Sequence, residues 1–202
     1  MLIDAFLDYL RLERNYSVKT IVSYRTDLLE FEEYFKKVDA ELDFTRVDAG
    51  IVRNWMVNLM DNGRTATTVN RKLSSLRSFY RFLLKRKVVS VDPMVKVVGP
   101  KKKKPLPSFV REKDMDRLLD ESLYDEGFEG CRDRAILEMF YATGMRRSEL
   151  IGLDVADVDL SAKLIKVTGK RNKQRLIPFG NELVEDLSLY IKVRNEELPQ
   201  RT

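Results

Sequence analysis

Residues 99–107 constrain the fold more than any other part of this 202-residue chain. Their sequence, Gly-Pro-Lys-Lys-Lys-Lys-Pro-Leu-Pro, holds three prolines and four adjacent lysines. Proline is rejected from a helix interior because it lacks the backbone donor, and the like charges repel one another. The sequence therefore predicts an extended linker over residues 99–108 between two domains, residues 1–98 and 109–202. The linker is either a plain connection or a segment that runs along a phosphate backbone.

Apolar residues recur at helical spacing in four stretches before the linker. Ser17 and Asp48 precede two of these stretches and are suitable N-caps, because their side-chain oxygens accept hydrogen bonds from first-turn amides. Residues 44–47 are expected to be extended, and Asp-Asn-Gly at residues 61–63 is expected to form a turn. Short connections of this kind favour a compact helical bundle. The predicted helices cover residues 2–14, 18–37, 49–60 and 65–87.

The net charge of +5 is unevenly distributed along the chain. Residues 1–105 carry 21 basic and 13 acidic side chains, whereas residues 106–202 carry 16 and 19. No acidic residue lies between Asp61 and Asp92. A field localised in this way indicates a polyanionic partner, with nucleic acid first and an anionic membrane second. The alternative is a basic face that meets only solvent.

The polar face of the helix predicted over residues 65–87 is dense in cations and short hydrogen-bond donors and has no acid. An α-helix fits the major groove of DNA, where such side chains reach bases and phosphates. The start of the second helix has a similar polar face. The candidate DNA-contacting residues are Lys19, Thr20, Ser23, Arg25, Thr67, Thr68, Asn70, Arg71, Lys72, Ser75 and Arg77, with Lys101, Lys102, Lys103 and Lys104 in the linker.

Composition excludes several classes of protein. The single cysteine, Cys131, rules out an internal disulfide, and with no histidine in the chain a zinc site is disfavoured. No apolar run approaches the ~18 residues that a membrane-spanning helix needs, and the acidic amphipathic N-terminus does not resemble a signal peptide. We therefore expect a cytoplasmic protein that uses no cofactor or metal and binds no membrane.

Residues 141–150, Tyr-Ala-Thr-Gly-Met-Arg-Arg-Ser-Glu-Leu, mark a junction between two helices. Gly144 is placed to close the first helix in the left-handed conformation. Arg146 lies at the start of the next helix, among unpaired amides, where a guanidinium can clamp a phosphate. The alternative is an ordinary surface ion pair between Arg146 and Glu149, three residues apart.

Two short β-type runs, residues 163–168 and 174–178, are joined by Gly-Lys-Arg-Asn-Lys and predict a hairpin with three cations at its tip. Residues 154–160 are expected to be a loop. Helices are expected over residues 111–122, 131–142 and 181–197, with Asn181 as the cap of the last. The fold class is therefore mainly α with a small sheet.

The order of these segments resembles that of the tyrosine site-specific recombinases (integrase family), most closely the Xer type. Residues 16–25 and 71–80 are similar to the two DNA-contacting helices of that family. The resemblance implies a SAM-like core-binding domain followed by the first part of an α+β catalytic domain. It also implies a clamp around duplex DNA and, for the full-length protein, assembly with other recombinase protomers into a tetramer.

The family cleaves DNA through a tyrosine that attacks the scissile phosphate, forms a 3′-phosphotyrosyl link and frees a 5′-hydroxyl. By resemblance, Arg146 matches the first arginine that clamps the phosphate. Lys170 matches the lysine that protonates the leaving 5′-oxygen, although a solvated turn lysine is the plain alternative. Arg147, Arg171 and Lys173 are expected to be additional backbone contacts or surface charge.

The chain departs from the family pattern after the hairpin. The family has a second group of catalytic residues, built from histidine and arginine and followed by the nucleophilic tyrosine, and it is not found here. Tyr190 is the only tyrosine after the hairpin, and it lies in an apolar stripe, so we expect it to be core. The resemblance thus implies a C-terminally truncated recombinase that binds DNA but is inactive in cleavage. Two alternatives are a stand-alone DNA-binding regulator of recombinase descent and a basic helical interaction module.

Overall fold

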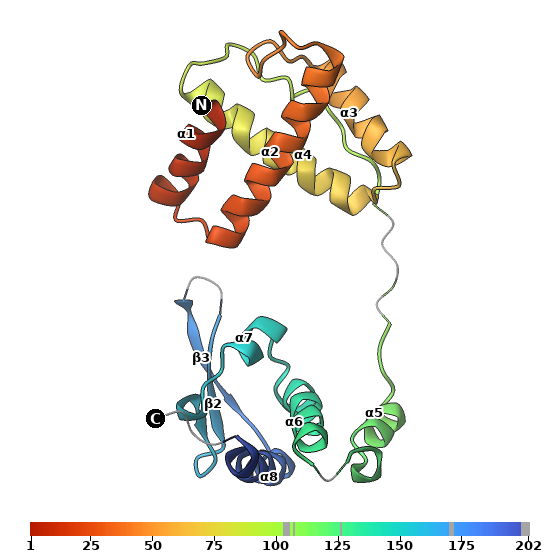
Figure 1. Cartoon of the computed structure of the whole chain (residues 1–202), viewed down its shortest axis with the longest axis vertical. Helices are drawn as coiled ribbons and strands as arrows, with labels where there is room; N and C mark the ends of the chain where they lie inside the picture. Colours follow the sequence, from red (N-terminus) through yellow and green to blue (C-terminus); the bar gives the residue numbers. More distant parts are fainter. Residues whose placement is uncertain (103–105, 107, 126, 170–171, 199–202) are drawn as a thin grey trace. The chain divides into compact units, whose positions relative to one another are not determined.

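The computed structural model describes residues 1–102, 106, 108–125, 127–169 and 172–198 (Figure 1). Chain contacts divide the protein into two compact units, Met1–Leu106 and Pro107–Thr202. Lys103 and Lys104 of the predicted linker lie outside the described residues. No helix in the described ranges is long and apolar enough to cross a membrane.

The first unit is helical throughout its regular structure (Figure 1). Ser17 accepts a hydrogen bond from the amide of Thr20 (3.3 Å) and Asp48 accepts one from the amide of Ile51 (2.9 Å), which confirms both predicted N-caps. Thr65 caps the fourth helix in the same way. The helices are α1 (Leu2–Asp8), followed by a π-helical turn (Tyr9–Glu13), α2 (Val18–Val38), α3 (Ala49–Asp61) and α4 (Ala66–Lys85).

The core of the first unit is aromatic. Phe31 packs edge-on against Phe35 and tilted against Trp55, with ring centroids 5.3 and 4.8 Å apart. Phe44 joins this cluster from the connection between α2 and α3. The predicted extended conformation there is wrong, because Asp43 accepts hydrogen bonds from the amide and hydroxyl of Thr45 and folds the segment into a turn.

The second unit has helices and a small sheet. Strand order is β1-β2-β3, both pairs are antiparallel, and the β2–β3 pairing confirms the predicted hairpin. The predicted loop at residues 154–160 is wrong in part, because a 3-10 turn and β1 lie there. The elements are α5 (Glu112–Leu118), a 3-10 turn (Glu121–Leu123), α6 (Phe128–Thr143), α7 (Arg147–Ile151), a 3-10 turn (Val155–Asp157), β1 (Val158–Asp159), β2 (Leu164–Thr168), β3 (Gln174–Pro178) and α8 (Asn181–Glu197).

The core of the second unit lies where α6 and α8 meet the sheet (Figure 1). Ile165 and Val167 alternate with exposed residues along β2, so one face of the strand is buried. They pack in one apolar cluster with Met139 of α6 and Leu183 of α8. Asn181, the predicted N-cap, is the first residue of α8. The N-cap position is occupied by Gly180.

Candidate active site and nucleic-acid interface

The junction between α6 and α7 places Arg146. Gly144 has a φ of +58° and its amide donates to the carbonyl of Phe140 (3.0 Å), which confirms the predicted left-handed C-cap. Arg146 has extended backbone angles and is the N-cap residue of α7. Its side chain is 72% exposed. The sharp end of α6 therefore presents this guanidinium to solvent at the start of the next helix.

Glu149 is the buried centre of this site, with a side chain only 2% exposed. It accepts hydrogen bonds from the backbone amide of Arg146 (2.8 Å) and from Nη1 of the same residue (2.9 Å). Arg175 of β3 binds both carboxylate oxygens, with Nη1 and Nη2 at 2.7 and 2.9 Å. The hydrogen bonds from Arg175, followed by those from Arg146, lower the pKa of Glu149 to about 2. The carboxylate therefore stays ionised and anchors two arginines.

The ion pair between Arg146 and Glu149 is confirmed, but it is not an ordinary surface pair. One partner is buried, and it fixes one nitrogen of the exposed guanidinium while the other edge stays accessible. Two arginines share one carboxylate, so the group keeps a net positive charge. That arrangement suits a phosphate. The buried carboxylate already orients the guanidinium of Arg146, so this side chain needs little rearrangement to bind an anion.

Arg175 is the residue that sequence reasoning missed. In the antiparallel register it pairs with Val167, whose side chain is buried. Directly paired residues project to the same face of a sheet, so the predicted hairpin already placed a cation beside an apolar core. Such a cation requires a carboxylate partner, and Glu149 was the acid in the preceding helix. The hairpin register thus indicates that Arg175 needs an acidic partner, but which acid it meets depends on where α7 packs against the strand.

The end of β2 where the hairpin loop begins lies against the same carboxylate. A Cβ at Gly169 would lie 3.1 Å from Oε1 of Glu149, so the strand end approaches closer than most side chains would permit. The amide of Gly169 donates to the carbonyl of Lys173 (2.7 Å), which closes the turn, and the side chain of Lys173 is exposed. The predicted site residues Lys170 and Arg171 lie outside the described residues. Arg147 is exposed at the start of α7.

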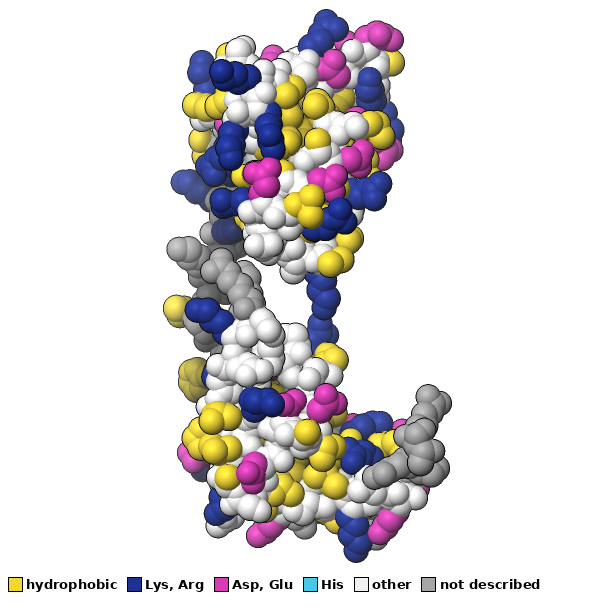
Figure 2. Space-filling view, turned by 90° about the vertical axis from the view of Figure 1, so that its left-hand side faces the viewer, with side chains coloured by type: hydrophobic (Ala, Val, Ile, Leu, Met, Phe, Trp, Pro, Cys, Tyr) yellow, Lys and Arg dark blue, Asp and Glu magenta, His cyan; other side chains and the backbone are white. Residues whose placement is uncertain are grey.

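The predicted interface residues of the first unit fall into distinct environments. On the face of this unit that Figure 2 shows, basic side chains are interspersed with acidic and apolar ones. Some candidates are partly buried, namely Thr20, Ser23, Thr68, Asn70 and Arg77. The exposed candidates are Lys19, Arg25, Thr67, Arg71, Lys101 and Lys102.

The expectation that Lys72 and Ser75 lie on an exposed face is wrong. Their exposures are 4% and 0%. Lys72 Nζ donates to Oε2 of Glu30 (2.5 Å) and to Oδ1 of Asp27 (3.2 Å), and Ser75 Oγ donates to Asp27 Oδ2 (2.7 Å). The physical reason is that α2 packs along this side of α4 and supplies the acids that α4 lacks.

Asn70 and Arg77 hold the chain that leads into the linker. Asn70 Nδ2 donates to the carbonyl of Pro100 (2.8 Å), and Arg77 Nη2 donates to the carbonyl of Val97 (3.0 Å). A Cβ at Gly99 would lie 2.2 Å from Oδ1 of Asn70, so a larger residue here would displace the side chain of Asn70. These two side chains thus place the beginning of the linker beside α4, and their contact with DNA stays a prediction.

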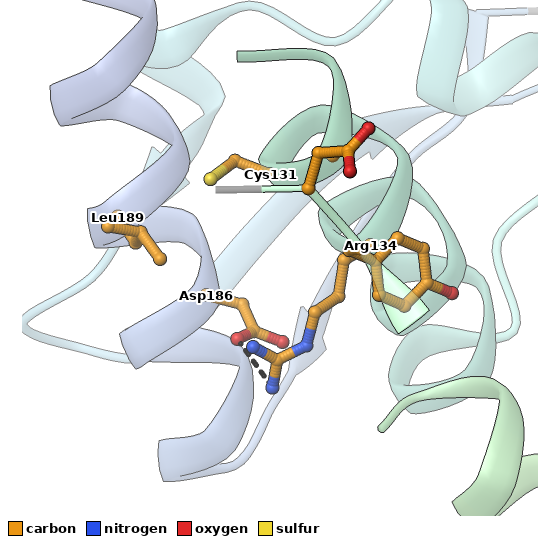
Figure 3. A pocket seen from close by; sticks show the side chains of 7 residues that line it. Cys131, Arg134, Asp186 and Leu189 are labelled. Atoms are coloured by element: carbon orange, nitrogen blue, oxygen red, sulfur yellow. Dashed lines mark ion pairs between the residues drawn. The ribbon is translucent and has the colours of Figure 1, made fainter. Parts of the chain in front are cut away.

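A separate small cavity of about 150 Å³ lies between α6 and α8. Figure 3 shows Arg134 and Asp186 pointing toward one another there, and their ion pair measures 3.1 Å. Cys131, which was expected near the helix start, is the fourth residue of α6 and lines this cavity. Of the predicted DNA-contacting and catalytic residues that the structure describes, none lines it, so the cavity is not part of the candidate site.

Comparison with known families matches both units. Residues 3–87 match the phage integrase N-terminal SAM-like domain, and residues 108–202 match the phage integrase family. The chain belongs to the phage integrase family. The SAM-like module corresponds to α1–α4, and the second match spans α6, α7 and the hairpin that meet at Glu149.

Curated relatives are tyrosine recombinases of the Xer type, as the resemblance predicted. The chain is 41% identical over 191 residues to tyrosine recombinase XerC of Staphylococcus carnosus, covering 94% of the chain and 63% of the relative. It is 38% identical to XerC of Halalkalibacterium halodurans, covering 99% of the chain and 65% of that protein. The chain thus spans less than two thirds of the length of these relatives.

Solved structures support the same fold. The integrase of transposon Tn1549 in complex with transposon right end DNA is similar over 96% of the chain and 65% of that protein, with a TM-score of 0.75 and 17% identity. The XerH site-specific recombinase bound to a palindromic difH substrate is also similar, with a TM-score of 0.70 and 19% identity. This match covers 99% of the present chain and 60% of XerH. At these identities the likeness concerns the arrangement of the backbone.

Proposed function

We propose that this protein performs site-specific DNA recombination by tyrosine recombinase chemistry, and that these residues bind duplex DNA and supply part of the active site. The observation that carries the proposal is the exposed guanidinium of Arg146, fixed by the buried carboxylate of Glu149. Family membership and the XerC relatives support the reaction type.

In the proposed mechanism, Arg146 binds a non-bridging oxygen of the scissile phosphate. Negative charge on the phosphate oxygens increases as the tyrosine attacks, so an oriented cation stabilises the transition state more than the ground state. Glu149 and Arg175 act as positioning residues, because Glu149 fixes Arg146 and Arg175 in turn holds Glu149. Lys170 follows Gly169 in the sequence, and we propose that it protonates the leaving 5′-oxygen.

Duplex DNA is the proposed partner of the first unit. The exposed cations Lys19, Arg25, Lys101 and Lys102 are proposed to contact phosphates, and Arg147 and Lys173 are proposed to do the same from the second unit. Other recombinase protomers are proposed as further partners on DNA. A structure related to this chain is a lambda integrase dimer bound to a core site, which supports assembly on DNA.

We further propose that a protein limited to these 202 residues binds its site without cutting it. The chain has no histidine for the second half of the family's active site. Tyr190 is partly buried and stacks on Phe128, with ring centroids 6.1 Å apart, so it is packed as a core residue would be.

The test is selection of binding sites from a randomised duplex pool with this chain. We expect enrichment of one palindrome-like sequence, bound at least ~10³-fold more tightly than random duplex at physiological salt. Affinities measured at two salt concentrations separate specific from electrostatic binding. A pool with no enrichment, together with weak and strongly salt-dependent binding, would instead favour the basic interaction module.

A further inference from the structure

The side chain of Arg71 on α4 is held from one side by α2. Its Nη2 donates to Oδ1 of Asp27 (2.8 Å), and its Nη1 donates to Oδ2 of Asp27 and to Oγ of Ser23 (2.8 Å). Asp27 is 1% exposed, whereas the side chain of Arg71 is 48% exposed. The guanidinium is therefore anchored at its end and accessible along an edge.

The accessible edge has a defined hydrogen-bonding capacity. A guanidinium carries five N–H donors in one plane. The contacts to Asp27 and Ser23 use both donors of Nη1 and one donor of Nη2. The two that remain, on Nε and Nη2, lie parallel on one edge, and within the described ranges no hydrogen bond from Nε is present. Such a pair of donors matches two adjacent acceptors, either O6 and N7 of guanine or two phosphate oxygens.

The charge around Arg71 favours a base over a phosphate. Arg71 and Lys72 face Asp27 and Glu30 in one connected cluster, so two cations meet two anions. A neutral cluster attracts phosphate weakly at a distance, but it still donates directional hydrogen bonds. The side chain is already ordered by two partners, so binding costs less conformational entropy.

The position of Arg71 in its helix agrees with contact to a base. Arg71 is the sixth residue of α4, which begins at Ala66, and Thr67 is exposed one turn earlier. Residues in the N-terminal part of a recognition helix are those that reach base edges when the helix lies in the major groove.

We propose that Arg71 is a specificity-determining residue that donates two hydrogen bonds to O6 and N7 of one guanine in the target site. Asp27 and Ser23 are positioning residues that fix the edge of the guanidinium facing the DNA. This inference rests on the proposed function of the chain as a duplex-DNA-binding protein.

The experiment begins with the duplex that the unaltered chain selects from a random pool. Dissociation constants are then measured for that duplex with 7-deazaguanine at each guanine in turn, which removes N7 and leaves base pairing intact. We expect one guanine whose replacement weakens binding by the unaltered chain. At that position Arg71→Lys, whose ammonium lacks the two parallel donors of a guanidinium, should lose discrimination against other bases, up to about 5- to 150-fold, and respond less to 7-deazaguanine than the unaltered chain does.

Three variants distinguish a base contact from a phosphate or structural role. Arg71→Met should leave the salt dependence of nonspecific binding unchanged, because a phosphate contact would lower its slope by about one unit. Ser23→Ala should reduce discrimination at the same guanine without changing the melting temperature. Arg81→Lys, at another exposed arginine of α4, is the matched control. It should change neither the discrimination at that guanine nor the salt dependence of nonspecific binding.

Distinct outcomes overturn distinct claims. If the unaltered chain selects no site, the proposed function fails and the role of Arg71 fails with it. If a site is selected but Arg71→Lys weakens all sequences equally, or Arg71→Met lowers the salt slope, Arg71 contacts phosphate and the inference alone is wrong. A fall in melting temperature for Arg71→Lys with unchanged discrimination would make the side chain purely structural.

Discussion

Asp27 and Glu149 are two buried carboxylates that each hold an exposed arginine, one in each unit of the chain. Their charge balance differs. Asp27 shares its cluster with Glu30, Arg71 and Lys72, which sums to zero, whereas Glu149 alone faces Arg146 and Arg175 and leaves one positive charge. Exposure of an arginine therefore does not define its role. A neutral cluster is suited to directional hydrogen bonds, and a positive one to an anion whose charge grows during reaction.

The two carboxylates also differ in the contacts that they bridge. Asp27 joins α2 to α4 across 44 to 48 residues of sequence, through Arg71, Lys72 and Ser75. Glu149 bonds Arg146 three residues away and Arg175 across 26 residues. Loss of Asp27 should therefore affect the folding of a whole unit, and loss of Glu149 should affect the local geometry of a site.

Asp27→Ala should have the largest effect on stability. The substitution leaves Lys72 buried with one carboxylate fewer and Ser75 with only its long contact to the carbonyl of Arg71 (3.5 Å), so we expect a loss of about 3–5 kcal/mol in the unfolding free energy of the first unit. Urea denaturation followed by the fluorescence of Trp55 measures it. Glu33→Ala, which removes an exposed ion pair from the same helix, is the control and should change little. Equal effects of both would show that the Asp27 cluster does not hold the helices together.

Arg146→Ala should separate binding from chemistry in a recombinase that contains these residues. We expect affinity for the selected site to stay within about threefold, while covalent protein–DNA product falls on the order of 10²–10³-fold, because the guanidinium acts on transition-state charge. Denaturing gels quantify the covalent product. Arg147→Ala, at the exposed neighbour that is proposed only to contact a DNA phosphate, should instead weaken binding and retain most of the cleavage once the site is saturated with protein. Unchanged cleavage with Arg146→Ala would exclude this residue from the active site.

The sequence predicted local features of both sites well. The caps at Ser17 and Asp48, the left-handed Gly144 and the hairpin depend on residues that are neighbours in sequence, and all of them are confirmed. The partners of Lys72 could not be predicted in this way. A polar helix face has the same pattern whether solvent or the acids of another helix lie against it, so burial of that face depends on packing.

Local sequence patterns likewise predict one contact of Glu149, with Arg146, but not the other, with Arg175. The contact with Arg146 follows from helical spacing, since residues three apart are neighbours. The contact with Arg175 required the register of β2 against β3, and in particular the pairing of Arg175 with the buried Val167. Which acid would meet that cation depended on where α7 packs against the strand, and this is a tertiary contact.

Glu149→Gln should lower cleavage less than Arg146→Ala does and leave DNA affinity unchanged, because the amide keeps the shape but not the charge that orients both arginines. The folded-state pKa of about 2 lies below the ordinary value of 4.5, so the carboxylate stabilises the fold above pH 4.5 and loses this contribution as pH falls towards 2. The melting temperatures of the unaltered protein and of Glu149→Gln, measured between pH 8 and pH 3, should therefore converge only at the acid end. A constant difference across that range would mean that the charge of Glu149 is not what stabilises the site.

Glu138→Gln should have the smallest effect and the opposite sign. Glu138 on α6 is 6% exposed, and its burial, followed by the charges of Asp186 and Glu182, raises its pKa above 4.5. A raised folded-state pKa favours the fold fully below pH 4.5 and opposes it as pH rises, when the buried group must ionise. The glutamine variant should thus be more stable by about 0.5–2 kcal/mol at pH 7 and show no gain near pH 4. Glu185→Gln, at an exposed position of α8, should give no such gain at either pH. The charge of Arg134 offsets the burial of Glu138 only in part, so the ionised carboxylate lowers stability at pH 7. An equal gain at both pH values would show that packing, not charge, causes the difference.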